Sequence, residues 1–405
     1  VDGTVAATTL TGDGSGITGV SASSIKSDDI TAGDAAVTIS TSTGAINLTP
    51  ADGSAIVLDG AVNVDAGVVT GVTSLTVSGE ASVTTLDIGG TNVTSTAAEL
   101  NVLDGALKEN NSIWIGNDPS STTNSAEYNY ALGVSALASI TTGDFNTAMG
   151  WRALKSNTTG HSNIGIGYVA LRDNVSDVGN VAIGYQSMQD ANGAEYNTAV
   201  GNNALRGTTD TDITGDENVA IGAGSLKFNI AGAQNAAVGR SSLYNNTNGS
   251  NNTAIGYWAL LDNTTATYNT AVGSNSLENT TTAGFNTGIG ANSLLTNTTG
   301  QSNTAGGVNS LYSNSTGNYN TGFGRNSLYA TTGSNNTSLG YQAGDVITTG
   351  SNNVVIGSGS DPSANSASNQ IVIGYGATGK GDNTVTIGNG DITTWSPTDD
   401  GEVDL

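Results

Sequence analysis

Cysteine, histidine and positive charge are scarce in this chain. There is no Cys and a single His, His161, so disulfides and thiolate chemistry are excluded and most metal and acid–base sites lose their usual ligands. The 34 Asp and Glu face only 10 Lys and Arg, which gives a formal net charge of −24. Because nucleic-acid binders use Lys and Arg to displace counterions from phosphates, we expect no nucleic-acid partner.

Long apolar runs and proline are also missing. No stretch approaches 18 consecutive apolar residues, so we expect no membrane insertion, and residues 1–20 lack the basic and apolar segments of a signal peptide. Pro occurs 4 times and charged residues make up 11%, whereas 57 of the 405 residues are Gly, about twice the usual share. This composition argues against helices and charged disordered tails and is typical of short strands joined by tight corners.

A five-residue phrase recurs along most of the chain. It occurs fourteen times from NYALG at 129–133 to NVVIG at 353–357, always with Asn first and Gly last, and weaker versions end at Gly116, Gly374 and Gly388. Of the sixteen intervals between closing glycines, thirteen are 17 residues and the others are 21, 16 and 14. A fixed period of this kind indicates a repeat architecture.

Other positions of the repeat are almost as strict. From Gly133 to Gly324 the residue three after the glycine is Ala or Ser, and the residue four after it is Leu in eleven repeats and Met188 in the twelfth. A second corner follows, with sequences such as NTTG at 157–160. Each repeat therefore predicts a strand, a Gly corner, a short second strand that carries Leu, and an Asn/Thr/Gly corner.

Seventeen residues suit one coil of a parallel β-solenoid, and sixteen intervals at about 4.8 Å predict a rod about 77 Å long. Alternation puts Thr, Val and Ile on one face of the strand and Asn, Ala and Gly on the other. We expect Ile, Val and Leu to fill the coil, with Ile183, Val200, Ile221 and Ile255 in one buried row. Asn should stack as an amide ladder and Gly should supply a corner with φ > 0. The ladder and corner positions include Asn146, Gly150, Asn180, Gly184, Asn197, Gly201, Asn252 and Gly256.

The coil predicted in this way is thin, and one of its faces carries only small residues. A face of Ala, Ser and Gly suits close packing against another chain, and one inward row of Ile and Leu gives little core per coil. We therefore expect a parallel homo-oligomer, with three chains as the favoured number.

The phrases NVAIG and NTAVGxxALxxNTTG resemble the head repeats of trimeric autotransporter adhesins, which form left-handed parallel β-rolls, and the 17-residue period resembles arrays in bacteriophage tail fibres. Residues 9–20 and 90–105 resemble tail-fibre shafts, and the end of the chain resembles the segment before a cleaved intramolecular chaperone. The resemblance implies an all-β, trimeric, left-handed β-roll behind a fibrous shaft. Its parts would be a shaft over 1–94, a junction with a short helix capped by Thr96 and Glu99 over 95–109, the solenoid over 110–390 and a cap containing Trp395 over 391–405.

Aromatic residues form two columns at the repeat spacing. Immediately before the repeat Asn lie Tyr128, Phe145, Tyr196, Tyr268, Phe285 and Tyr319, whose rings we expect to seal a seam between coils or chains. One or two residues after the corner glycine lie Trp151, Tyr168, Tyr185, Tyr257, Trp258 and Tyr341. Packing between coils and stacking on sugar rings both remain open for this second column, and Trp151, Tyr168, Tyr257 and Trp258 are the candidate receptor-binding residues.

Few other residues suggest chemistry. The insertion responsible for the 21-residue interval carries Asp210, Asp212, Asp216 and Glu217, which form either a solvated loop or a Ca²⁺ site; no other cofactor is expected. His161 has no acidic partner at a fixed spacing, so we read it as a loop residue, and GDGSG at 12–16 lacks the βαβ context of a dinucleotide site.

Taken with the resemblance, these features favour a non-enzymatic structural fibre of a phage tail in the virion. It would join other tail or fibre proteins at its N-terminal end and attach to a host cell-surface glycan or protein. The alternative is the head of a trimeric autotransporter adhesin on a bacterial surface. An ice-binding solenoid lacks its T-x-T ranks here, and a polysaccharide depolymerase lacks recurring carboxylate pairs. Since the chain is acidic, we expect receptor binding to use aromatic rings rather than charge.

Overall fold

The computed structural model describes residues 86–88, 91–93, 106–109, 111–115, 125–208 and 211–392. The chain divides into two compact units, Val1–Thr84 and Thr85–Leu405, and every described residue belongs to the second. Most of the predicted shaft, the capping box at Thr96 and Glu99, and the predicted cap with Trp395 therefore lie outside the described residues.

Every element among the described residues is a β-strand. Two antiparallel pairs come first in the chain: β1 (Leu86–Ile88) pairs with β2 (Thr91–Val93), and β3 (Ala106–Glu109) pairs with β4 (Ser112–Ile115). β3 occupies the last four residues of the segment expected to be the junction.

After β4 the chain forms three-residue strands, one in each repeat. They are β5 (Tyr130–Leu132), β6 (Thr147–Met149), β7 (Ile164–Ile166), β8 (Val181–Ile183), β9 (Thr198–Val200), β10 (Val219–Ile221), β11 (Ala236–Val238), β12 (Thr253–Ile255), β13 (Thr270–Val272), β14 (Thr287–Ile289), β15 (Thr304–Gly306), β16 (Thr321–Phe323), β17 (Thr337–Leu339), β18 (Val354–Ile356), β19 (Ile371–Ile373) and β20 (Val385–Ile387).

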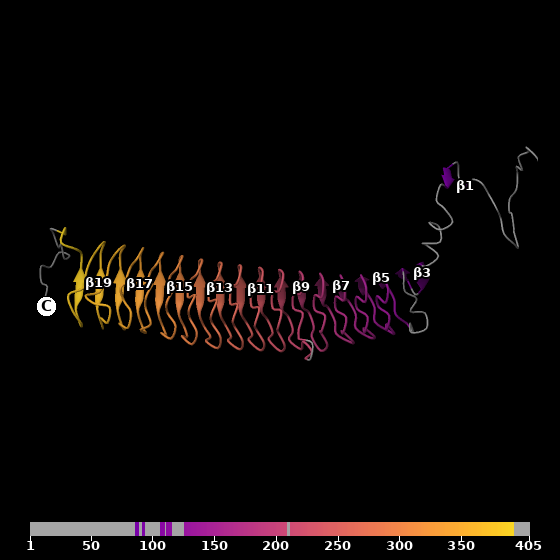
Figure 1. Ribbon diagram of the computed structural model, residues 1–405, viewed down its shortest axis with the longest axis horizontal. Helices are drawn as coiled ribbons and strands as arrows, with labels where there is room; N and C mark the ends of the chain where they lie inside the picture. Colours follow the sequence, from indigo (N-terminus) through magenta and orange to yellow (C-terminus); the bar gives the residue numbers. More distant parts are fainter. Residues whose placement is uncertain are drawn as a thin grey trace, which may run out of the picture. The chain divides into compact units, whose positions relative to one another are not determined.

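Each strand from β4 to β20 pairs in parallel with the next strand of the chain, in register; Thr253, for example, lies beside Thr270. Figure 1 shows the strands side by side along an extended rod, with β3 and β19 toward opposite ends. Among the described strands β20 pairs only with β19 and β3 only with β4, so the sheet does not close into a barrel. The predicted parallel β-solenoid with one coil per 17-residue repeat is confirmed, and its strands fall within the predicted 110–390.

The inner and outer faces of the sheet are the reverse of the prediction. In each of β5 to β19 the central residue, such as Ala182 or Ala254, is fully buried, whereas the two flanking side chains face outward. Ile183, Ile221 and Ile255 do stack in one row, but they are 37%, 41% and 42% exposed, so the expected buried row is wrong. A three-residue strand points its centre one way and its ends the other, and the Leu and Asn side chains fill much of the interior, so the central residue is Ala, Gly or Ser in β5 to β17. In β18 and β19, after the Leu column has ended, the larger Val355 and Val372 are buried instead.

The segment that follows each corner glycine is a run of turns, not the predicted second strand. Two of its residues adopt positive φ, as at Arg152 (55°) and Leu154 (50°). Its amides still bond to neighbouring coils: Leu154 N donates to Ala170 O over 3.0 Å, and Arg152 N donates to Val134 O over 3.0 Å. The Leu four residues after the corner glycine, such as Leu154, is fully buried and is the large apolar side chain that recurs most often in the core.

The repeat Asn forms the expected amide ladder inside the coil. The backbone N of Asn163 donates to Oδ1 of Asn146 over 3.0 Å, and Nδ2 of Asn146 donates to Gly160 O over 2.9 Å. The same links run from Asn129 to Gln370, where the Gln370 backbone N donates to Asn353 Oδ1. Each buried amide therefore joins its own coil to the next coil and to the second corner.

The corner glycine is required by both backbone conformation and packing. Gly201 has φ +139°, and a Cβ built on it would lie 2.6 Å from the carbonyl oxygen of Gly222 in the next coil. The expected Gly corner with positive φ is therefore confirmed. We call the outward positions of β5 to β20 the sheet side, and the residues one to six positions after each corner glycine the turn side.

Candidate functional site

Three of the candidate aromatic residues of the second column stack on one another along the turn side. The ring centroids of Trp151 and Tyr168 lie 4.8 Å apart and those of Tyr168 and Tyr185 lie 5.2 Å apart, with interplanar angles of 13° and 9°. The Arg152 guanidinium lies 4.0 Å from the Trp151 ring centroid. All three rings are exposed, but Arg152 and the stacking cover both faces of Trp151 and the faces between the rings, so a sugar could reach only the ring edges and the outer face of Tyr185.

Tyr257 and Trp258 form a separate aromatic pair six coils further along, about 29 Å from Trp151 at the spacing of parallel strands. Their ring centroids lie 4.6 Å apart. Tyr257 is exposed and Trp258 is half-buried. The four candidate receptor-binding residues therefore belong to two places on the rod.

The first aromatic column is also exposed. Tyr128 stacks on Phe145 with centroids 5.0 Å apart, and Tyr268 stacks on Phe285 at 5.3 Å. These rings join neighbouring coils, as expected, although all of them remain more than half exposed. A contact with another chain through this column stays a prediction.

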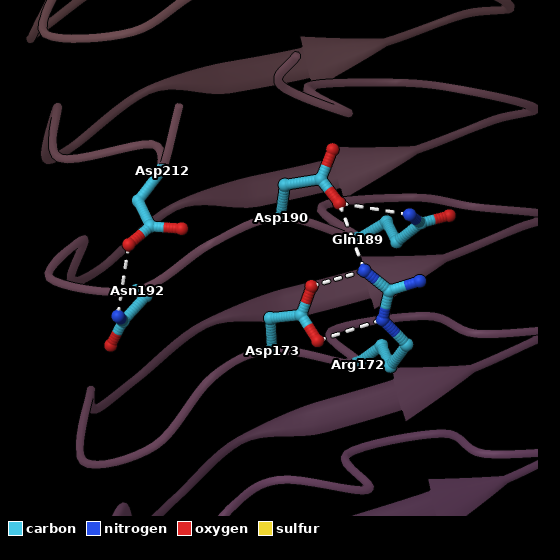
Figure 2. Close-up of polar contacts among 6 residues, drawn as sticks. All are labelled: Arg172, Asp173, Gln189, Asp190, Asn192 and Asp212. Carbon is cyan, nitrogen blue, oxygen red and sulfur yellow. Dashed lines mark hydrogen bonds and ion pairs between the residues drawn. The ribbon is translucent and has the colours of Figure 1, made fainter. Parts of the chain in front are cut away.

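The carboxylates of the acidic insertion do not form one cluster. Asp212 Oδ2 accepts from Asn192 Nδ2 over 3.0 Å, as Figure 2 shows, while Asp216 Oδ1 accepts from the Glu195 backbone N and Glu217 Oε2 accepts from Gln234 Nε2. Asp210 lies outside the described residues. Within the parts of the chain that the structure describes, no three His, Asp or Glu residues are grouped to hold a metal ion.

A charged cluster that the sequence did not reveal lies beside the insertion (Figure 2). Arg172 forms ion pairs with Asp173 and with Asp190, and the Asp190 carboxylate also accepts from Gln189 Nε2 over 2.8 Å. The hydrogen bond to Asp173 raises the pKa of Arg172, and burial raises the pKa of Asp190. The guanidinium of Arg172 is thus neutralised within the protein.

Two further cations, Lys227 and Arg240, line a groove of about 460 Å³ on the turn side. Lys227, Arg240, Tyr244 and Trp258 are among its lining residues, together with the amide of Asn245. Lys227 Nζ lies 3.0 Å from Tyr244 Oη and 4.6 Å from the centroid of the Phe228 ring. Of these residues sequence reasoning identified only Trp258.

A signal for this groove exists in the sequence. Six of the ten basic residues lie within 152–240, and all of them fall on the turn side: Arg152, Lys155, Arg172, Arg206, Lys227 and Arg240. When the repeats are aligned by their corner glycines, Lys155, Arg172, Arg206 and Lys227 all lie five residues after the glycine. This column of basic residues could have located the groove from the sequence.

Near the C-terminal end, Asp361 takes the place in the repeat that Leu occupies in earlier coils. Burial and the nearby Asp345 raise the pKa of Asp361 to about 6. His161 is exposed in its corner and lies beside Ser162, with Nδ1 and Oγ 3.4 Å apart.

Within the described part of the chain, no helix has the length and hydropathy needed to cross a membrane. No protein-family model matches the chain, and no curated protein is similar enough in sequence to count as a relative.

Proposed function

We propose that this chain is a structural fibre protein of a phage tail, a parallel homotrimeric rod that attaches to a host surface and has no enzymatic role. The observation that supports the proposal most strongly is the absence of charge on the sheet side. Its outward residues in β5 to β20 include no charged residue, although the chain as a whole carries a net charge of −24. Exposed Ile, Val, Leu and Phe side chains run along it from coil to coil.

A second copy of this chain is the partner that best fits the sheet side. An outward residue without charge recurs once per coil, with exposed Ile or Phe in every second coil from Ile183 to Phe323, and only a solenoid with the same rise keeps contact over the full length of the rod. A face about 77 Å long and one three-residue strand wide, about 10 Å, covers roughly 800 Å², which is the usual contribution of one partner to a stable interface.

The face proposed here for association is not the one expected from the sequence. The Ala and Ser positions that we expected to pack against another chain lie inside the coil, and the larger apolar side chains take their place outside. The number of three and the link to phage tails continue to rest on the resemblance of the repeats to adhesin heads and tail fibres.

Sedimentation of the full chain tests the assembly. The wild type should sediment as a trimer, and Ile255→Lys with Ile289→Lys should dissociate it, because a charge would then face an apolar partner. Val134→Lys with Val308→Lys is the matched control, since these exposed apolar residues lie on the turn side. A folded wild-type monomer would refute the trimer, and equal dissociation by both pairs would refute its assignment to the sheet side.

Electron microscopy with an antibody against the solenoid tests the location. Labelling of tail fibres on virions supports the proposal, whereas labelling of a bacterial surface in uninfected cells would favour the adhesin alternative.

A further inference from the structure

We propose that the groove beside Lys227 and Arg240 binds an acidic saccharide, a sugar that carries a carboxylate. The inference rests on the proposed attachment function and names the class of ligand that the turn side would recognise. It also replaces the expectation that the acidic chain would avoid charged receptors, because the groove is locally basic.

The two cations of the groove are not neutralised by the protein. Neither Lys227 nor Arg240 forms an ion pair with any residue that the structure describes, whereas Arg172, in the same repeat position as Lys227, pairs with two carboxylates. The difference lies in the next repeat position, which holds Asp173 and Asp190 around Arg172.

Around Lys227 the same position holds Phe228 and Asn245 instead of acids. Lys227 is held in place by neutral groups, since its Nζ contacts Tyr244 Oη at 3.0 Å and lies over the ring of Phe228. An ammonium group has three donors, so donors remain for a ligand.

Arg240 supplies a second cation with a planar donor group. Its side chain is exposed, and its guanidinium lies 5.8 Å from the centroid of the Tyr257 ring. A guanidinium binds a carboxylate through two parallel hydrogen bonds, which suits a carboxylated sugar better than a point charge would.

The rest of the lining suits the neutral part of a sugar. Trp258 is half-buried and offers an apolar surface for a ring face. The amide of Asn245 donates one hydrogen to Asp262 Oδ1 over 3.0 Å and that of Asn203 donates one to Asn202, so each keeps a second donor hydrogen, and Asn203 Oδ1 has no partner among the described residues. The volume of about 460 Å³ lies in the ordinary range for small-molecule sites. A ligand of high charge density, such as a nucleic acid, would still meet the net charge of −24, whereas a uronic or sialic acid carries a single charge per sugar.

The groove also remains open in the proposed trimer. Every residue that lines it belongs to the turn side, and none comes from the strands whose outward residues would contact another copy. Each chain of the trimer would present one groove, and three weak contacts to one surface would add as avidity.

Calorimetry on the full chain tests the inference with defined probes. The acidic probes are trigalacturonate and sialyllactose; their neutral counterparts are carboxyl-reduced trigalacturonate and lactose. We expect at least one acidic probe to bind about tenfold more tightly than its neutral counterpart, as one charge-assisted contact provides. Equal affinity within both pairs, or no binding of either acidic probe at millimolar concentration, would overturn the inference.

A matched pair of variants locates the site. Lys227→Gln with Arg240→Gln should raise the Kd of the acidic probe about tenfold, since both charged contacts to the carboxylate are lost. The control, Lys155→Gln with Arg325→Gln, removes the same charge from the same two repeat positions elsewhere; Arg325 lies 5.9 Å from the Tyr341 ring centroid, much as Arg240 lies beside Tyr257. An equal loss in the control, or inorganic phosphate competing as well as the sugar, would refute the saccharide site.

The outcome is separable from that of the proposed function. A trimeric chain labelled on virions that fails to bind either acidic probe would remove the groove site and leave the fibre in place. Binding of the acidic probe by a chain that sediments as a monomer would support the groove and refute the trimeric rod.

Discussion

The sheet side and the turn side of the solenoid differ in how much they change from coil to coil. On the sheet side, the third strand residue is apolar in every strand from β5 to β20, with Gly306 as the single residue lacking a side chain. On the turn side, the residue after the corner glycine varies among Trp, Tyr, Arg, Asn, Ser, Ala and Val. The outward residues of the sheet side are therefore nearly uniform from coil to coil, whereas the turn side presents a different side chain in most coils.

The turn side buries the Leu four residues after the corner glycine, whereas the sheet side exposes Ile side chains such as Ile255. The largest expected change in stability tests this contrast. Leu260→Ala on the turn side should lower the free energy of unfolding by about 3 kcal/mol, because it leaves a cavity in a fully buried site. Ile255→Ala on the sheet side should cost less than about 1 kcal/mol in the isolated chain. Urea unfolding measures both.

Protein concentration separates core from interface in the same experiment. The cost of Ile255→Ala should grow with concentration if the sheet side contacts another copy, because association stabilises the folded chain. The cost of Leu260→Ala should not depend on concentration in this way. Equal costs of the two variants at every concentration would contradict the assignment of the inner and outer faces.

The amide ladder connects the two sides, and its removal should have the next largest effect. Asn252→Ala leaves the buried Asn269 backbone N without its acceptor and removes one of the two donors to the Ala266 carbonyl, so we expect a loss of about 2 kcal/mol. Asn279→Ala, at a half-buried turn-side Asn, is the control and should cost below about 0.5 kcal/mol. Thermal unfolding of both variants measures the difference, and similar losses would argue against the ladder.

The pH dependence of stability tests the half-buried carboxyl of Asp361, which lies on the turn side at the repeat position that Leu holds in earlier coils. The pKa of Asp361 is raised from 3.8 to about 6, so the folded state binds a proton more tightly than the unfolded state between these values. Stability therefore falls as pH rises from about 4 to about 6 and stays lowered above that. Asp361→Asn should be more stable than the wild type by about 1 kcal/mol above pH 6, a value reduced for the half-exposed carboxyl. An advantage that persists unchanged at pH 3.5 would exclude this cause.

The smallest expected effect on stability concerns the exposed aromatic stack. Trp151→Ala should cost about 0.5–1 kcal/mol, because one exposed ring contact with Tyr168 is lost. If the rings recognise a host surface, Trp151→Ala and Trp258→Ala should weaken adsorption while the trimer stays intact. Unchanged adsorption would refute a receptor role for these rings, and a dissociated trimer would support packing instead.

The features that the sequence predicted well are those fixed by backbone geometry. Gly201 needs φ +139° and has no space for a Cβ, and Asn252 belongs to a column of fourteen successive Asn residues because each amide bonds to the next. Such requirements admit few residue types, so they appear as nearly invariant columns. The period, the corners and the ladder could therefore be predicted from spacing alone.

The features that the sequence missed depend on the cross-section of the coil. Alternation separates Ala182 from Ile183 but does not say which faces inward, and size pointed the wrong way because Leu from the turn side already fills the interior. The positive φ of Leu154 leaves no trace in its residue type, so its turn was read as a strand. The groove was missed because Lys227, Arg240 and Trp258 lie in successive coils and meet only when the coils stack.

The hydrogen bonds between coils have a mechanical consequence for a rod under tension. The strand and ladder bonds join one coil to the next along the rod axis, so a pull on its ends loads the interfaces between coils in series. The terminal coil should yield first, and each 17-residue coil released would lengthen the chain by about 55 Å, its extended length less one stacking distance. Such a solenoid would give way under load in equal steps and recover by rewinding onto the coils that remain.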